Sequence, residues 1–199
     1  MSFRLAGLPD CAPRTGNAFT RWVGRSVLRL GGWHIVGDFP AQKKLVIIAA
    51  PHSSGWDAIW GLAAKLAMGL QLVFMGKQEL FRGPQGWMLR RMGAIPVDRE
   101  RAHGVVDQIV ERFDQSDTMW FVLAPEGTRK RVKQWKTGFW HMARDAGVPV
   151  LCAYFDYPSK TIGIGEMFKM TADLKGDMAR IREYYRPFIG KHRGTTWDG

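Results

Sequence analysis

Short apolar runs alternate with amphipathic stretches along most of this chain of 199 residues. The runs with the length of a buried strand are residues 45–50, 72–75, 94–97, 119–124, 148–155 and 161–168. The stretches with helical character are residues 57–68, 84–92, 102–113, 137–145 and 173–185. Strands that alternate with helices are typical of layered α/β folds, because a helix usually makes the crossover between two parallel strands. The alternation therefore predicts an α/β fold: a single layered domain with a mostly parallel central sheet flanked by helices.

A short amphipathic helix is predicted before the first strand, over residues 18–30. The side chains at helical spacing on one face are Phe19, Trp22, Val23, Ser26, Val27 and Leu30. Arg21, Arg25 and Arg29 recur every four residues on another face. Such a helix can lie flat on an anionic bilayer, or it can dock on the domain with its arginines in water. We divide the chain accordingly into an N-terminal segment, residues 1–30, and a main domain, residues 31–199.

The charge of the chain favours anionic partners. It has 29 Lys and Arg against 18 Asp and Glu, a net charge of +11. Acidic lipid surfaces, phosphorylated small molecules and nucleic acid all fit this charge. Aromatic residues make up 12% of the chain and suit either base stacking or a membrane interface. Composition alone therefore leaves a basic nucleic-acid-binding module open as an alternative.

Several other classes of protein are disfavoured. Two cysteines, Cys11 and Cys152, supply neither a four-thiolate zinc site nor a disulfide scaffold. The histidines other than His52 have no partner at metal-ligand spacing, so we expect no metal. The longest apolar stretch, residues 58–75, is interrupted by Lys65 and Gln71, which argues against a spanning helix. The N-terminal residues have no signal-peptide core, so we expect a cytoplasmic location.

Charged and polar residues follow four of the predicted strands, at the ends where α/β sheets bind their ligands. His52 and Asp57 follow the first of these strands, Glu79 the second, Asp98 the third and Glu126 the fourth. Several cations accompany them. We therefore expect one histidine and four carboxylates along a single rim of the sheet.

His52 and Asp57 form the first candidate pair. On a continuous helix, residues five apart point about 140° away from each other, so the two side chains can meet only across a turn. The intervening Ser53-Ser54-Gly55 has turn chemistry. Asp57 would then orient the imidazole and leave its other nitrogen as a general base, unless Asp57 only stabilises a helix N-terminus. No GxSxG elbow is present, so the base would activate a hydroxyl or amine of the substrate.

Glu126-Gly127-Thr128-Arg129 is a more specific signal. Gly127 permits a tight turn, and the turn's N–H groups with Thr128 can form an anion nest. Arg129 can bind two phosphate oxygens at once. The plainer interpretation is a surface turn with a Glu126–Arg129 ion pair. Gly76-Lys77 is no Walker A loop, because Gln78 stands where Ser or Thr is required, so ATP binding is not predicted.

Together these blocks resemble the glycerolipid acyltransferase superfamily of the lysophosphatidic acid acyltransferase type. The HxxxxD block is His52-Ser53-Ser54-Gly55-Trp56-Asp57. The second block runs from Gly76-Lys77 to Asp98-Arg99, and the third is Pro125-Glu126-Gly127-Thr128-Arg129. Val148-Pro149-Val150 resembles the fourth. The four blocks occur in the family's order over residues 45–150, which makes the joint match far more specific than any single block.

The resemblance implies transfer of an acyl group from acyl-CoA or acyl carrier protein to the hydroxyl of a lysophospholipid. His52 would be the general base and Asp57 its orienting carboxylate, without a metal, a cofactor or a covalent enzyme intermediate. The residues implied to bind substrate, in particular an acceptor phosphate, are Lys77, Arg99, Glu126, Gly127, Thr128 and Arg129. An amine lipid or another alcohol stays open as the acceptor.

The family usually carries N-terminal helices that anchor it in the membrane. Here only the short helix over residues 18–30 could serve this purpose. We therefore expect a peripheral protein on the anionic inner face of the cell membrane, and no nucleic-acid partner.

Overall fold

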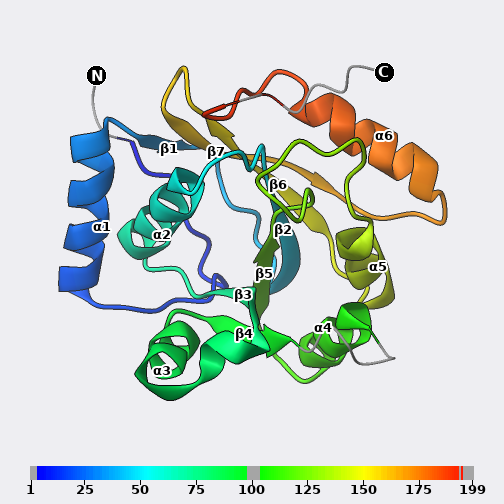
Figure 1. Cartoon of the computed structure of the whole chain (residues 1–199), viewed down its shortest axis with the longest axis horizontal. Helices are drawn as coiled ribbons and strands as arrows, with labels where there is room; N and C mark the ends of the chain where they lie inside the picture. Colours follow the sequence, from blue (N-terminus) through cyan, green and yellow to red (C-terminus); the bar gives the residue numbers. More distant parts are fainter. Residues whose placement is uncertain (1–3, 98–103, 193, 195–199) are drawn as a thin grey trace.

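The computed structural model describes residues 4–97, 104–192 and 194, which form one seven-stranded sheet flanked by helices (Figure 1). The strands are β1 (His34–Val36), β2 (Lys44–Ala50), β3 (Leu72–Lys77), β4 (Ala94–Val97), β5 (Met119–Leu123), β6 (Val150–Asp156) and β7 (Thr161–Phe168). The helices are α1 (Ala18–Gly31), α2 (Trp56–Met68), the 3-10 helix η1 (Gln78–Phe81), α3 (Gly83–Arg91), α4 (Val105–Asp114), α5 (Gly138–Asp145) and α6 (Leu174–Tyr185). The predicted α/β class is confirmed.

The sheet is mostly parallel, as predicted. Its strand order is β1-β7-β6-β2-β5-β3-β4, and β6 with β7 is the antiparallel pair. β2 pairs in parallel with β5 on one side and with β6 on the other. The carboxyl ends of these three strands therefore meet at one edge, near the middle of the sheet.

Alternating side chains of the central strands build two cores. Leu45 and Ile47 of β2 pack with α1 and α2, whereas Val46 and Ile48 pack with α4, α5 and α6. Figure 1 shows α1 and α2 on one side of the sheet and α5 and α6 on the other. Because period-2 alternation buries both faces, each fully covered side chain stabilises the sheet by roughly 1.5–3 kcal/mol.

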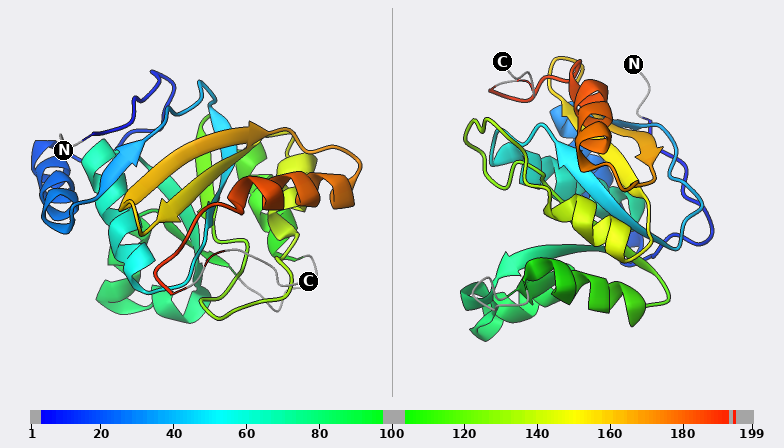
Figure 2. Two further views of the ribbon diagram at one scale, coloured as in Figure 1. Left: turned by 90° about the horizontal axis from the view of Figure 1, so that it is seen from above. Right: turned by 90° about the vertical axis from the view of Figure 1, so that its right-hand side faces the viewer.

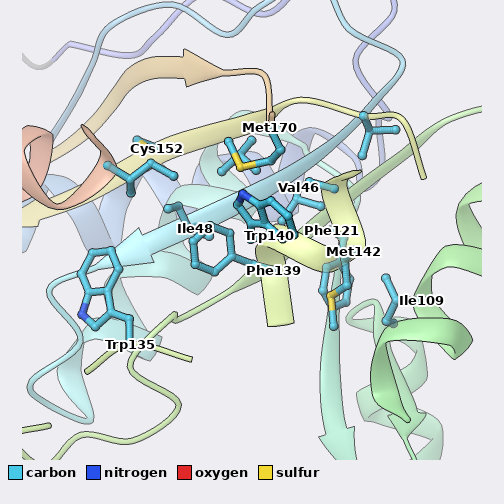
Figure 3. Close-up of a cluster of buried hydrophobic side chains, with 14 of the residues drawn as sticks. Val46, Ile48, Ile109, Phe121, Trp135, Phe139, Trp140, Met142, Cys152 and Met170 are labelled. Carbon is cyan, nitrogen blue, oxygen red and sulfur yellow. The ribbon is translucent and has the colours of Figure 1, made fainter. Parts of the chain in front are cut away.

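The larger core is rich in aromatic side chains (Figure 3). Trp140 and Phe139 of α5 lie against Ile48 and Phe121 of the sheet. The indole N–H of Trp140 donates to the buried carboxylate of Asp177 at 2.8 Å, so its polar atom is satisfied inside the core. This bond joins α5 to α6.

α1 is present as predicted, but the structure divides its apolar residues between two faces. Gly24 and Leu28 are buried against α2, whereas Phe19, Trp22 and Leu30 are 67%, 63% and 90% exposed. Gly24 permits the close approach, since a side chain there would collide with the backbone of α2. The predicted arginine stripe is also divided, because Arg25 donates to the carbonyl of Ala67 at 3.4 Å. One edge of the stripe therefore helps to hold the C-terminal end of α2.

The segment after α6 returns across the carboxyl end of β6 to the loop that follows β2. In the left view of Figure 2 it approaches this loop. Phe188 stacks on Tyr154, with ring centroids 3.6 Å apart. Further along, the N–H of His192 donates to Oγ of Ser53 at 3.2 Å. The end of the described chain is thus tied to the predicted site.

Most predicted elements match the structure within two residues, with three differences. β1 begins at His34, where the sequence indicates a strand start, but neither β1 nor η1 is long enough to show a period that fixes its range. The helix predicted over residues 102–113 begins later, at Val105, and ends at Asp114. Gly104 is its N-cap and has a non-helical backbone, and residues 102 and 103 lie outside the described residues. The boundary between residues 30 and 31 stays a prediction. Among the helices of the described residues, none has the length and apolar character that crossing a bilayer requires.

Candidate active site

His52 and Asp57 are in contact, as their spacing predicts. Nδ1 of His52 lies 3.1 Å from Oδ2 of Asp57. His52 follows β2 in the loop, and Asp57 lies in the first turn of α2. The turn between them lets the carboxylate reach back to the ring, and about a quarter of the His52 side chain stays exposed. When the N–H at Nδ1 donates to Asp57, the Nε2 atom is left as the basic nitrogen.

Asp57 is buried and accepts hydrogen bonds on both oxygens. Its Oδ2 also accepts the backbone N–H groups of Ser53 and Ser54, at 2.8 and 2.9 Å. Its Oδ1 accepts the hydroxyl of Tyr157 at 2.5 Å. Burial by itself raises the pKa of Asp57, but the hydrogen bonds from His52, Tyr157 and Ser54 outweigh it and hold that pKa below its ordinary value. The carboxylate therefore stays charged at neutral pH.

The two serines that follow His52 accept backbone hydrogen bonds that hold the loop in place. Oγ of Ser54 accepts the N–H of Trp56 at 3.2 Å, at the start of α2. Oγ of Ser53 accepts an N–H from the C-terminal segment. Both residues are buried. Ser54 thus supports the start of α2, whereas Ser53 holds the C-terminal segment.

Glu126 joins the second predicted motif to the first. Its Oε2 accepts the backbone N–H of His52 at 2.7 Å, although the two residues are 74 positions apart. Glu126 is buried, and it follows β5 just as His52 follows the neighbouring β2. The expectation that these strand ends meet is therefore correct. The contact fixes the backbone that carries the imidazole.

The turn at residues 126–129, together with Lys136, forms a cationic corner beside the loop that carries His52. Gly127 has a φ of +66°, a left-handed conformation that favours glycine, and the side chain of Lys136 passes close to its Cα. Arg129 reaches the turn between His52 and Asp57: its Nη1 lies 3.1 Å from where a Cβ on Gly55 would stand. Oγ1 of Thr128 accepts the N–H of Lys130 at 3.2 Å, which shapes the turn. Arg129 thus lies beside the turn that joins His52 to Asp57, and Lys136 lies beside Gly127.

Not every predicted residue can be placed at the site. Lys77 is the last residue of β3, but its side chain lies outside the described part. Arg99 and Asp98 lie outside the described residues altogether. Glu79 is exposed on η1. Of the four carboxylates expected along the rim, Asp57 and Glu126 are brought together.

Sequence reasoning missed Tyr157, which lies 100 positions from Asp57. It follows β6 directly, so extending the strand-end rule to this strand would have found it. Lys191 was also missed: its Nζ lies 4.9 Å from the centre of the Trp56 ring. No local pattern indicates that the end of the chain returns to this loop.

The arrangement has a definite chemical capacity. The imidazole of His52 is steered by a charged, buried carboxylate and can take a proton from a hydroxyl group. Arg129 and Lys136 lie nearby with exposed side chains that can attract an anion. A base beside a cationic corner suits a nucleophile that carries a phosphate group.

Comparisons with known proteins agree with this chemistry. The family model described as Acyltransferase matches residues 34–156. Three curated relatives carry the name 1-acyl-sn-glycerol-3-phosphate acyltransferase. The Streptococcus pneumoniae protein is 31% identical over 99 residues, which cover 49% of this chain and 36% of the relative. The Haemophilus influenzae protein is 29% identical over 152 residues, covering 70% and 60%, and the Escherichia coli protein is 28% identical over 129 residues, covering 61% and 51%.

The chain therefore spans between 36% and 60% of the length of these relatives. Among solved structures, the 1-acyl-sn-glycerophosphate (LPA) acyltransferase PlsC from Thermotoga maritima is similar, with a TM-score of 0.57 at 18% identity. The match covers 83% of this chain and 75% of that protein. At this identity the likeness shows the fold.

Proposed function

The chain belongs to the acyltransferase family, and we propose that it transfers a fatty acyl group from an acyl thioester to the hydroxyl of a lysophospholipid such as 1-acylglycerol-3-phosphate. The observation that carries the proposal is the contact of His52 with Asp57 beside the corner that contains Glu126 and Arg129. The names of the three curated relatives support this acceptor.

In the proposed mechanism Nε2 of His52 takes the proton of the acceptor hydroxyl while its oxygen attacks the thioester carbonyl carbon. The tetrahedral intermediate collapses as the carbon–sulfur bond breaks, and the imidazolium returns the proton to the leaving thiolate. Asp57 orients the ring and stabilises its transient positive charge, and a placed base of this kind contributes about 10²–10⁴-fold. The thioester is already activated, so the cycle needs no acyl-enzyme.

We assign the substrate phosphates to the cationic corner. Arg129, with the turn at Gly127 and Thr128, would bind the acceptor phosphate, and Lys77 and Arg99 stay assigned to substrate by resemblance. The donor is acyl-CoA or acyl carrier protein, both of which carry phosphate. The net charge of +11 would speed the encounter with either donor.

A panel of acyl donors and lysolipids with mass-spectrometric product detection tests the proposal. Wild-type protein should form a diacyl product, and His52→Ala should abolish turnover while His141→Ala, a change on α5, keeps it. Equal turnover by a folded His52→Ala variant would refute the mechanism. Arg129→Ala should raise KM for phosphate-bearing acceptors, whereas Arg112→Ala on α4 should not; equal effects of Arg129→Ala on phosphate-free acceptors would contradict the phosphate role.

We further propose that the protein attaches peripherally to the inner face of the cell membrane through α1. The exposed side chains of Phe19, Trp22 and Leu30 support this, with Arg25 and Arg29 next to them on the helix. Deleting the helix would uncover α2, so the sharper test is Phe19→Ser with Trp22→Ser. This double variant should lower co-sedimentation with anionic vesicles about fivefold or more. The control Met167→Ser, an exposed apolar residue on β7, should not, and equal sedimentation of both would count against α1.

A further inference from the structure

We propose that Tyr157 is a positioning residue of this active site, whose hydroxyl holds Asp57 and sets how strongly the carboxylate pulls on His52. The inference rests on the proposed function, in which Asp57 steers the general base. It adds a third group to the pair, from a residue that lies just beyond the part of the chain matched by the family model, residues 34–156.

The contact is direct and divides the carboxylate between two partners. The Tyr157 hydroxyl donates to Oδ1 of Asp57 at 2.5 Å. The other oxygen, Oδ2, faces Nδ1 of His52 at 3.1 Å. Because one carboxylate joins the phenol to the imidazole, whatever changes the first bond changes the charge available to the second.

Tyr157 is itself fixed from several sides. Its backbone N–H donates to the carbonyl of Ile189 at 2.9 Å, and its ring meets Trp33 edge-on at 4.9 Å. Its oxygen also takes part in a hydrogen bond with the Trp60 side chain. Burial and the hydrogen bond to Asp57 raise the pKa of Tyr157, so the hydroxyl stays protonated as a donor. A donor held this firmly restricts the carboxylate to one orientation.

The hydroxyl also moderates the charge on Asp57. A hydrogen bond to Oδ1 withdraws charge that would otherwise favour the protonated imidazole of His52. Removing the hydroxyl should therefore leave more charge facing the ring and less control of its orientation. The other groups around the pair do not change: they are the N–H groups of Ser53 and Ser54 on Asp57, Glu126 on the His52 amide, Arg129 beside Gly55, and Lys191 above Trp56.

The test compares Tyr157→Phe with Tyr154→Phe in the full chain. Tyr154 lies near the carboxyl end of β6, the strand that Tyr157 follows, and its ring stacks on Phe188. Tyr154→Phe therefore controls for the loss of a phenol hydroxyl. Tyr157→Phe should lower kcat about tenfold because the carboxylate no longer holds the ring in one orientation, a loss in the range expected for one hydrogen bond to a charged group. KM for the acceptor should stay within about twofold. The acid limb of its kcat/KM profile should move to higher pH. Tyr154→Phe should leave the profile in place.

Each outcome of this comparison either supports or overturns the role of Tyr157. Unchanged kcat and an unchanged profile in Tyr157→Phe overturn the proposal, and so does an equal loss in both variants without a profile shift, which indicates a structural role. If Tyr157→Phe does not fold, Trp60→Phe, which removes the donor to the phenol, should lower kcat about twofold and shift the acid limb in the same direction; no shift there also overturns it.

An NMR measurement separates this proposal from the proposed function. The proton on Nδ1 of His52 should change its resonance in Tyr157→Phe and keep it in Tyr154→Phe. Wild-type protein that transfers no acyl group would defeat the proposed function, whereas an unmoved His52 resonance would defeat the role of Tyr157.

Discussion

Replacing Asp57 with Asn tests whether the charge of this buried carboxylate drives the chemistry. The exchange should preserve the local structure. The amide oxygen can occupy the Oδ2 position and accept the N–H groups of Ser53 and Ser54. The amide nitrogen then faces Tyr157, whose hydroxyl can turn and accept. His52 keeps an acceptor for Nδ1, so the change removes charge rather than contact.

The expected loss follows from the distance between the two groups. A full charge on Asp57 at 3.1 Å from Nδ1 of His52 stabilises the imidazolium by about 5 kcal/mol at an effective dielectric of about 20. The partial exposure of His52 screens this interaction, so about 3–4 kcal/mol should be lost from the transition state. That corresponds to a kcat lower by about 10²–10³-fold.

The assay measures kcat and KM for Asp57→Asn against the best acyl donor and lysolipid, with thermal unfolding as the check on folding. Asp145→Asn, which changes an exposed carboxylate on α5, is the matched control. KM for the acceptor should stay within about threefold, because Asp57 does not face it in the proposed mechanism. A well-folded Asp57→Asn variant that keeps more than about a fifth of wild-type kcat would show that the carboxylate only builds the loop.

Three further outcomes are expected. Glu126→Ala removes the acceptor of a backbone N–H and should lower kcat more than it raises acceptor KM; an effect confined to KM would assign Glu126 to the substrate instead. Gly24→Ala should lower the free energy of unfolding by about 1–3 kcal/mol in urea titration, because the methyl group overpacks the contact between α1 and α2; an unchanged midpoint would contradict this packing. Asp177→Asn should cost about 2–3 kcal/mol at neutral pH, since the carboxylate accepts from Thr171 and Trp140. Burial by itself raises the pKa of Asp177, but hydrogen bonds lower it overall. The extra stability of the wild type over Asp177→Asn should therefore be complete above about pH 5 and shrink as pH falls below about 4. A stability difference that does not change with pH would show that Asp177 is not charged in the folded protein.

The elements of the fold could be read from local patterns with little error. The runs over residues 94–97 and 161–168 are strands with the predicted limits. A buried strand needs a short continuous apolar run and a helix needs a 3.6-residue period, and both are properties of neighbouring residues. The His52–Asp57 contact belongs to the same class, because a turn of three residues is enough to close it.

The faces of α1 mark the limit of such patterns. Periodicity places Phe19, Trp22 and Leu30 on one apolar face of the helix. The structure leaves these side chains exposed and buries Gly24 and Leu28 instead. A helix buries the face that allows the closest approach to its neighbour, and here the absent side chain of Gly24 decides it. The neighbour, α2, is not recognisable as a partner from the sequence of α1.

The sequence by itself determined the α/β order, the turn that joins His52 to Asp57 and the presence of an acidic and basic corner at residues 126–129. Tertiary structure alone decided that Glu126 holds the His52 backbone across 74 positions and that Tyr157 reaches Asp57 across 100. The reason is that strand order in the sheet, with β2 between β5 and β6, brings these ends together. That order depends on how two whole cores pack, and no local stretch of sequence contains it.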